Sequence, residues 1–482
     1  MNYRVVFHIT GNLLIIVGLL MMTGIPFSLY YGSNDIPALL ISGSITSIVG
    51  VLLHISTRGF NPSDLRNREG YLIVTLNWIL MSLFGSLPFL IHGAIPSFTN
   101  AFFETVSGLT TTGASILSDI ESLPKGLLFW RSMTHWIGGM GIIVLSLAIL
   151  PILGVGGMQL FKAEVAGPTK DKIHPKVKDT AQRLWAIYVI FTFIETVLLM
   201  TGGMNLFDAL CHSFGTLASG GFSTKNASVA AYNSPFIEYV IIVFMFIAGT
   251  NFTLHYFAFH GKLQEYFKDS EFRFYIIFIF LVVSAISLFL FFNNHQSIES
   301  SFRDSAFSVI SILSSTGFVT VNYEAWAPFF REVFLILLLF GACAGSTSGG
   351  VKMVRYQLLF KSSIVELKRL VHPNAIIPVR HNNKSVDTGI LIKIAAFVIL
   401  YYFTLGIATT ILALTGLDLT TAAGSAAACI ANIGPGLNQT GPVSNFSNIP
   451  ELAKWILSAV MILGRLELFS VFVLLSPSFW KN

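Results

Sequence analysis

Four short stretches of small residues, each containing a glycine, are the part of this sequence best suited to chemistry. Each glycine follows an aligned position by ten residues, and the four are Gly113, Gly220, Gly317 and Gly434. Glycine allows backbone dihedral angles that point successive carbonyl oxygens at a common axis, where they replace the hydration shell of a cation. Four copies in register therefore predict a ring of carbonyl oxygens around an ion pathway.

The segment before each glycine predicts the element that positions it. These segments are too short and too polar to cross a bilayer, yet too apolar for plain loops. Non-helical backbone at membrane depth survives only where it is buried in protein or lines water. We therefore expect four repeats of helix, re-entrant pore loop and helix around a central pore. The C-terminal, partially negative end of each short pore helix should point at the ion.

The composition places the chain in a membrane. Of the 482 residues, 54% are hydrophobic and 11% are charged, whereas a soluble domain carries roughly 25% charged residues. A soluble enzyme is therefore excluded, and nucleic-acid binding has no support. No Gly-x-x-x-x-Gly-Lys-Ser/Thr loop is present, which argues against a pumping ATPase, so we expect no enzymatic activity. The isolated residues Cys211, Cys343 and Cys429 predict neither a disulfide framework nor a metal site.

About ten apolar runs are long enough to cross roughly 30 Å of hydrocarbon. They lie near 5–30, 36–56, 70–92, 127–153, 182–203, 235–259, 272–293, 328–359, 386–415 and 449–475. Basic residues gather on one side of these runs, which predicts that both termini are cytoplasmic. The expected fold is an all-α polytopic membrane protein. Its units would be two N-terminal helices (1–60) and four pore repeats (61–180, 181–265, 266–385 with a gating loop, and 386–482).

The second span of the third repeat is interrupted by residues 341–350, which include four glycines and no bulky apolar side chain. Such a stretch is unsuited to continuous helix. It predicts either a flexible intramembrane loop that obstructs the pore beneath the filter, or close helix packing through small residues. The gating residues in the first interpretation are Ala344, Gly345, Ser346, Thr347, Ser348 and Gly349.

Arg465 lies about midway along the last predicted span, where an unpaired charge is expensive, so it must face protein or water. One interpretation is a buried ion pair, with Glu467 or Glu195 as the candidate partners. The other is a positive charge in the pathway just below the filter, which would repel cations and set the barrier to permeation. We expect His135 and His212 to be packed or hydrogen-bonded rather than metal ligands, because no second ligand stands at helical spacing.

Five motifs resemble the TrkH/KtrB/HKT superfamily of potassium transporters along essentially the whole chain. They are Gly-Leu-Thr-Thr-Thr-Gly-Ala (108–114), Trp-Ile-Gly-Gly-Met-Gly-Ile-Ile-Val (136–144), Leu-Gly-Val-Gly-Gly-Met-Gln-Leu (153–160), Ala-Gly-Ser-Thr-Ser-Gly-Gly-Val-Lys (344–352) and Leu-Gly-Arg-Leu-Glu (463–467). The two extra N-terminal spans and the stretch from 153 to Pro175 are more similar to the TrkH branch. The fourth copy departs from the Thr/Ser-Gly pattern, since it has Asn432 and Ile433 before its glycine.

The resemblance implies a channel-like potassium uptake subunit of the bacterial inner membrane that takes K⁺ as its transported ion and binds no cofactor. It also implies a homodimer, in contact with membrane lipid, that works with a cytosolic nucleotide-binding ring protein of the TrkA kind, with NAD or ATP as the nucleotide. A symporter that moves potassium with protons or sodium is the alternative. The expected filter residues are Thr111, Thr112, Gly113, Ser219, Gly220, Thr316, Gly317, Ile433 and Gly434. The expected K⁺ ligands are Thr111, Thr112, Ala218, Ser219, Ser315, Thr316, Asn432 and Ile433, and Arg465 joins 344–349 in the gate.

Overall fold

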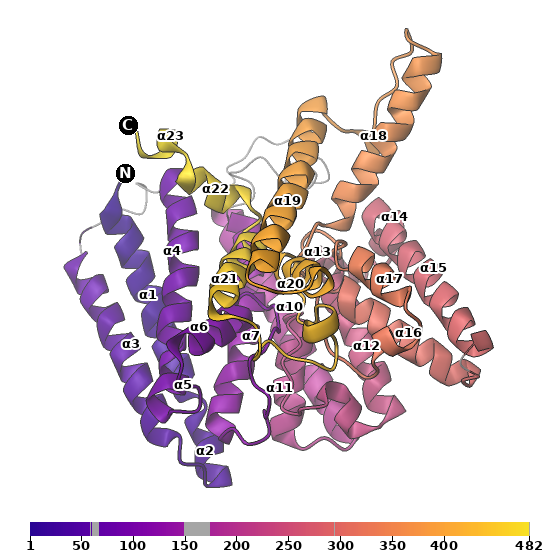
Figure 1. The fold of residues 1–482 in the computed structure, drawn as a ribbon. Helices are drawn as coiled ribbons and strands as arrows, with labels where there is room; N and C mark the ends of the chain where they lie inside the picture. The colour runs from indigo at the N-terminus through magenta and orange to yellow at the C-terminus, as the bar shows by residue number, and fades with distance from the viewer. Residues whose placement is uncertain (58, 60–66, 149–173, 294, 482) are drawn as a thin grey trace.

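The computed structural model describes residues 1–57, 59, 67–148, 174–293 and 295–481, which form a helical bundle (Figure 1). Both termini lie at the same end of the bundle as the projecting end of α18. The 153–160 motif lies outside the described residues.

The helices follow the expected order of two N-terminal spans and four repeats. The N-terminal part holds α1 (Tyr3–Met22), α2 (Ile25–Tyr31) and α3 (Ile36–Ser56). Repeat 1 holds α4 (Asn67–Gly85), α5 (Leu87–His92), α6 (Phe98–Leu109) and α7 (Lys125–Ala148). Repeat 2 holds α10 (His174–Thr201), α11 (Leu206–Leu217), η2 (Ser228–Tyr232), α12 (Pro235–Gly249), α13 (Phe252–Phe259) and α14 (Gln264–Lys268).

Repeat 3 ends in a small hairpin that follows its last helix. It holds α15 (Ser270–Asn293), α16 (Ile298–Leu313), η3 (Tyr323–Ala325), α17 (Phe330–Leu337), α18 (Met353–Val371), β1 (Arg380–His381) and β2 (Lys384–Ser385). The two strands are antiparallel, with Arg380 opposite Ser385. Repeat 4 holds α19 (Thr388–Leu414), α20 (Leu419–Ala431), η4 (Asn438–Thr440), α21 (Glu451–Arg465), α22 (Phe469–Leu475) and α23 (Pro477–Trp480).

The described residues contain fewer uninterrupted spans than the ten apolar runs suggest. By length and composition, six helical segments can cross a membrane, and two bent pairs raise the number to eight. The α12–α13 pair bends by 103° and the α21–α22 pair by 116°. The run at 328–359 is not one helix, because α17 ends at Leu337 and α18 begins at Met353. Hydropathy alone does not detect these breaks, since the residues around them remain apolar.

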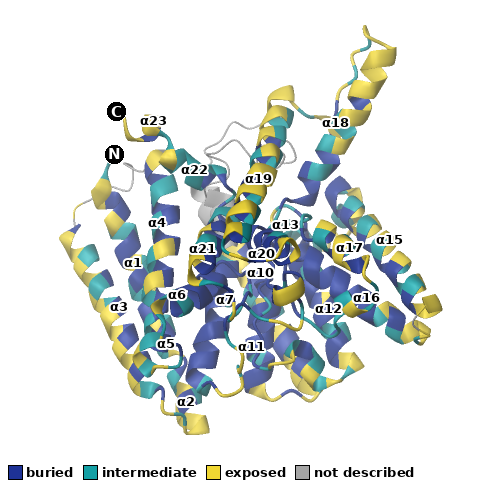
Figure 2. Cartoon of the chain, in the orientation of Figure 1, coloured by how far each residue is buried: buried dark blue, intermediate teal, exposed yellow. Residues whose placement is uncertain are grey.

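Side chains on the outer helices are apolar and exposed, as a lipid-facing surface requires. Figure 2 shows the exposed residues along α3, α15 and α19 and the buried ones around α7, α11 and α20. Examples of exposed apolar side chains are Ile48 and Leu52 on α3, Phe280 and Leu281 on α15, and Ile399 and Phe403 on α19. The protein core therefore surrounds the short helices that precede the four glycine-containing turns.

Four short helices, α6, α11, α16 and α20, begin with the same cap. The residue before each helix is Ser97, Asn205, Ser297 or Asp418, and its side chain accepts a hydrogen bond from the backbone N–H three residues later. Such a cap satisfies one of the free N–H groups at the start of a helix. The shared cap fixes where each pore helix starts, and it places the start of the third at Ile298.

Candidate functional site: a ring of four turns above a polar loop

Each pore helix ends in the same hydrogen-bonded turn. The residue in the left-handed conformation is Thr111, Ser219, Ser315 or Asn432, with φ between 53° and 57°. In all four, the next residue's N–H bonds to the carbonyl five residues before it, at 2.8 Å: Thr112 to Ser107, Gly220 to Gly215, Thr316 to Ser311, and Ile433 to Ala428. This is the Schellman pattern that ends helices, and it gives four equivalent exits toward the centre of the bundle.

The shared turn corrects the register of the second repeat. Glycines with φ near +80° stand two residues after the left-handed residue at Gly113, Gly221 and Gly317. Gly221, not Gly220, is therefore the structural counterpart of Gly113, and Gly220 corresponds to Thr112. The ten-residue count starts at Phe103 in repeat 1 and at Leu210 in repeat 2. It fails here because α11 reaches its turn one residue later relative to Leu210 than α6 does relative to Phe103.

The four turns contact one another in a closed ring. A Cβ atom added to Gly113 would lie 2.0 Å from the Gly220 carbonyl oxygen, and one added to Gly221 would lie 2.0 Å from that of Thr316. A Cβ on Gly317 would meet Gly434 N at 2.9 Å, and one on Gly434 would meet Gly113 O at 2.9 Å. Each turn therefore contacts the turn of the next repeat, and the fourth contacts the first. The contacts are too close for a side chain at any of these four glycines. A cavity of about 100 Å³ opens above the ring and is lined by all four of these glycines.

The carbonyl oxygens of the ring are left without partners. Within the described residues, the carbonyls of 110–113, 218–221, 314–317 and 431–434 accept no hydrogen bond from another protein group. Buried carbonyls are ordinarily paired. A ring of unpaired carbonyls next to a small cavity is an arrangement suited to a dehydrated cation. Among the described residues, no group of three or more His, Cys, Asp or Glu side chains could hold a metal ion.

Two buried groups that sequence reasoning did not assign to the filter hold the ring in place. His135 on α7 accepts a hydrogen bond from Phe222 N–H at Nε2 (3.1 Å) and lies 2.8 Å from the Gly108 carbonyl through Nδ1. Because the Phe222 N–H needs an acceptor and the carbonyl needs a donor, the imidazole is neutral with its proton on Nδ1. It joins α6 of repeat 1 to the segment that follows the turn of repeat 2.

The second group is a buried ion pair between Arg131 Nε and Glu104 Oε1, at 2.7 Å. Glu104 also accepts hydrogen bonds from Ser115 Oγ and Ile116 N, and Arg131 donates to the Ser223 carbonyl at 3.0 Å. The pair therefore ties together the chain segments that leave the first and second turns. The only sequence signal was that two opposite charges lie in apolar segments of one repeat.

The interrupted segment of repeat 3 is a loop that lies directly beneath the ring. Its ends are joined where Gly341 N–H donates to the Val351 carbonyl (2.9 Å) and Met353 N–H to that of Ala342 (3.1 Å). Thr347 donates to the Leu217 carbonyl (2.9 Å) and shares a hydrogen bond with Ser219. The expectation of a break in the helix is confirmed.

The loop also reaches the third and fourth turns. Gly349 N–H donates to Ser315 Oγ at 2.7 Å. A Cβ atom on Gly349 would lie 2.2 Å from the Ala431 carbonyl oxygen, so the backbone passes directly against the end of α20. Together with the bonds of Thr347 to repeat 2, these contacts place the loop against the ends of three pore helices, α11, α16 and α20.

Arg465 supplies the link to the remaining repeat. It is the last residue of α21, at the bend rather than midway along a straight span. Its guanidinium is 2% exposed and donates to the Thr347 carbonyl and to the Gly138 carbonyl, both at 2.9 Å. Within the described chain Arg465 has no carboxylate partner, because Glu467 pairs with Arg355 instead. The positive charge of Arg465 therefore lies at the level of the loop and is bound by backbone carbonyls.

One carboxylate holds both ends of the loop. Glu271, the second residue of α15, accepts hydrogen bonds at Oε1 from Ala344 N (2.7 Å) and Val354 N (3.0 Å). Lys352 is 8% exposed, and its ammonium group donates to Ser348 Oγ at 3.0 Å. Arg355 is buried as well, so neither cation is available for direct contact with another protein.

Comparison with known proteins agrees with this geometry. Residues 35–482 match the family model TrkH, described as a cation transport protein. The chain belongs to the TrkH family. It is 41% identical to the Trk system potassium uptake protein TrkH of Escherichia coli K12 and 39% identical to that of Halomonas elongata, in both cases over the full length of both chains. The crystal structure of the potassium transporter TrkH from Vibrio parahaemolyticus superposes with a TM-score of 0.92 at 36% identity, covering all of both chains.

Membership of the TrkH family confirms the resemblance drawn from the motifs, and the family is one of transport proteins rather than enzymes. It does not settle the role of Glu195, the remaining intramembrane acid. Glu195 on α10 is completely buried, lies beside Thr216 of α11, and makes no hydrogen bond of normal geometry in the part of the chain described. It is not brought together with Arg465 as an ion pair.

Proposed function

We propose that this chain is the potassium-translocating subunit of a Trk-type uptake system, with the ring of four turns as its selectivity filter. The carbonyls of 111–113, 219–221, 315–317 and 432–434 would coordinate K⁺ in place of water. The observation that carries the proposal is the ring of unpaired carbonyl oxygens, built from four identical helix ends. The relatives named potassium uptake proteins support potassium as the ion.

The loop 344–349 and Arg465 form the gate in this proposal. The hydrogen bonds of Thr347, Gly349 and Arg465 support a closed arrangement, because together they connect the loop to all four repeats just below the filter. A cation that leaves the filter inward would meet this loop and a fixed positive charge. Opening requires these hydrogen bonds to break together, so the loop has one closed and one open state. A partner that binds the two states with different energies shifts the ratio between them.

Control of the gate would come from a cytosolic nucleotide-binding ring protein of the TrkA kind, acting on a homodimer in the bacterial inner membrane with both termini in the cytoplasm. The placement of α18 supports this, because it starts where the loop ends and projects beyond the bundle at the end that also holds the termini (Figure 1). Since Lys352 and Arg355 are buried, the partner would act by moving α18 rather than by contacting them.

The test is ion flux through the purified full chain in liposomes, with and without the nucleotide-loaded ring protein. A potassium-selective current that follows the potassium gradient and increases with the partner would support the proposal. Equal permeability to sodium and potassium in the open state would contradict the filter assignment. No effect of any nucleotide-loaded partner would contradict the control mechanism while leaving the filter intact.

Symport with protons is the second candidate, and Glu195 is the observation that favours it. A buried carboxylate without an ionic partner is the kind of group that can carry a proton across a membrane. Reversal potentials measured with opposed pH and potassium gradients separate the two. A dependence on the pH gradient that Glu195→Gln abolishes would establish coupling.

A further inference from the structure

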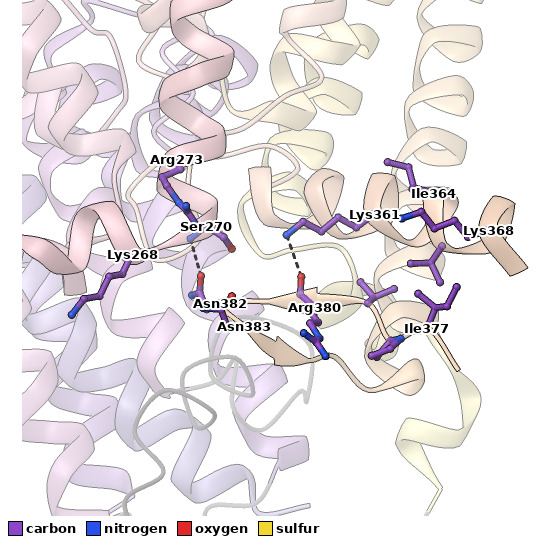
Figure 3. A pocket seen from close by; sticks show the side chains of 13 residues that line it. Lys268, Ser270, Arg273, Lys361, Ile364, Lys368, Ile377, Arg380, Asn382 and Asn383 are labelled. Atoms are coloured by element: carbon purple, nitrogen blue, oxygen red, sulfur yellow. Dashed lines mark hydrogen bonds between the residues drawn. The ribbon is translucent and has the colours of Figure 1, made fainter. Parts of the chain in front are cut away.

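A basic pocket lies where α15, α18 and the β1–β2 hairpin meet, and Figure 3 shows the residues that line it, with Ser270 facing Asn382 and Lys361 reaching toward Arg380. Its cavity volume is about 400 Å³. The charged and polar lining comes from Lys268, Ser270, Arg273, Lys361, Lys368, Arg380, Asn382 and Asn383. None of these residues belongs to the ring of turns or to the loop beneath it.

Positive charge in the basic pocket is only partly balanced by carboxylates of the described residues. Lys268 pairs with Glu265 at 2.8 Å, but Arg273, Lys361, Lys368 and Arg380 form no ion pair with a carboxylate in the described ranges. Burial, and next the neighbouring charge of Arg273, lower the pKa of the Lys361 ammonium. Like charges held around one concavity raise the free energy of the empty pocket, and a bound anion relieves that cost.

The pocket also has an apolar side and lies at one end of a membrane span. Ile364, Val365, Ile377, Pro378 and Val379 line the rest of the cavity. The apolar span Ser270–Asn293 begins at the pocket wall, so the basic groups lie at the depth of a membrane surface. A ligand with a phosphate group fits the cationic side, and an attached acyl chain fits the apolar side.

We propose that the basic pocket binds the phosphate group of an anionic ligand, either a phospholipid headgroup or a soluble phosphate compound. Arg273 and Arg380 offer planar guanidinium groups, which match two phosphate oxygens at once. Lys361 and Lys368 add point charges from α18. The amide group of Asn383 lies on the same lining, so neutral donors are present beside the cations.

The basic pocket is connected to the loop beneath the filter through one pair of neighbours. Ser270 N donates to Asn382 Oδ1 at 2.7 Å, and the Ser270 carbonyl accepts from Gln357 Nε2 of α18 at 2.8 Å. The next residue, Glu271, holds both ends of the loop. An anion that draws α18 and the hairpin toward Ser270 therefore stabilises or releases that carboxylate. This second step rests on the proposed gate, whereas anion binding itself does not.

Binding is tested on the purified full chain, with pyrophosphate as the soluble probe and phosphatidylglycerol as the lipid probe. Calorimetry follows pyrophosphate, and native mass spectrometry counts retained phosphatidylglycerol. Arg273→Gln combined with Lys361→Gln should weaken binding at least about tenfold, because each charge-assisted hydrogen bond is worth roughly a factor of ten or more. The matched control Lys384→Gln, on the same hairpin but outside the lining, should bind as the parent does.

Binding of either probe that the double variant loses supports the proposal and identifies the source of the phosphate. Equal binding by parent and double variant, or no binding of either probe by the parent, overturns it. Lys361 also donates to the Arg380 carbonyl, so Arg273→Gln with Lys368→Gln serves as a second variant if the first does not fold.

Potassium flux in phosphatidylcholine liposomes, with and without the probe that binds, tests the link to the loop. A change in parent flux that the double variant lacks and Lys384→Gln keeps supports the link. Unchanged flux with proven binding overturns the link alone. Absence of any potassium flux from the parent, even with the loop shortened, would count against the proposed function and not against the pocket.

Discussion

The filter ring and the loop beneath it use the same kinds of residue, glycine, serine and threonine, for opposite purposes. In the ring, Schellman bonds satisfy the N–H groups, and the carbonyls are left unpaired. In the loop, the Thr347 hydroxyl bonds to repeat 2 and the Gly349 N–H bonds to the pore-helix end of its own repeat. The ring is held by four copies of one local motif, whereas the loop depends on single contacts from different segments. We therefore expect the ring to stay fixed, because each turn makes its own bonds. We expect the loop to detach more readily, because its bonds depend on separate segments staying in place.

Shortening 344–349 should separate the two regions most clearly. Removal of the obstruction should raise basal potassium flux per folded molecule by roughly tenfold or more, since the closed state loses its barrier. Selectivity should stay at the parent level because the ring keeps its own bonds. Flux assays with potassium and sodium check both points, and a well-folded variant with parental basal flux would rule the loop out as the gate.

Arg465→Ala removes the link between the loop and repeat 1. It removes two charge-assisted hydrogen bonds, each worth about 1.5–3 kcal/mol. If about 1.4 kcal/mol of that stabilises the closed state over the open one, flux should increase about tenfold. The matched control is Arg183→Ala, which removes an exposed arginine bonded to Tyr256. Reduced expression without increased flux would show that Arg465 serves only to stabilise the fold.

Gly113→Ser and Gly221→Ser should lower the preference for potassium over sodium. A side chain at either position meets a neighbouring carbonyl at 2.0 Å and requires a strained positive φ, at a cost of about 1–3 kcal/mol. Gly434→Ala should do less, because its Cβ meets its nearest neighbour at 2.9 Å. Reversal potentials give the order, and a Gly434 effect as large as that of Gly221 would contradict the ring geometry.

Glu271→Ala should give the smallest of these changes, a rise in basal flux of about fivefold. It removes two hydrogen bonds at the ends of the loop, each worth about 1 kcal/mol, partly replaced by water. Glu271→Gln keeps an acceptor oxygen and is the matched control, with flux expected near the parent value. If both variants conduct as the parent does, the carboxylate does not restrain the loop.

The sequence by itself determined the membrane class, the four pore helices and the break in repeat 3. Each of these depends on local composition: apolar runs, capping residues such as Ser97 and Asp418, and a glycine-rich stretch that cannot form a stable helix. The family followed from motifs of the same local kind.

Only the tertiary structure decided how these parts meet. The structural counterpart of Gly113 in repeat 2 is Gly221 and not Gly220, which depends on where α11 ends. Counting residues along the sequence does not distinguish two adjacent glycines. Sequence could not pair Arg355 with Glu467, direct Arg465 to two carbonyls, or place Glu271 at both ends of the loop, because these partners lie far apart along the chain. Such contacts form when separate repeats pack together, and no local pattern encodes them.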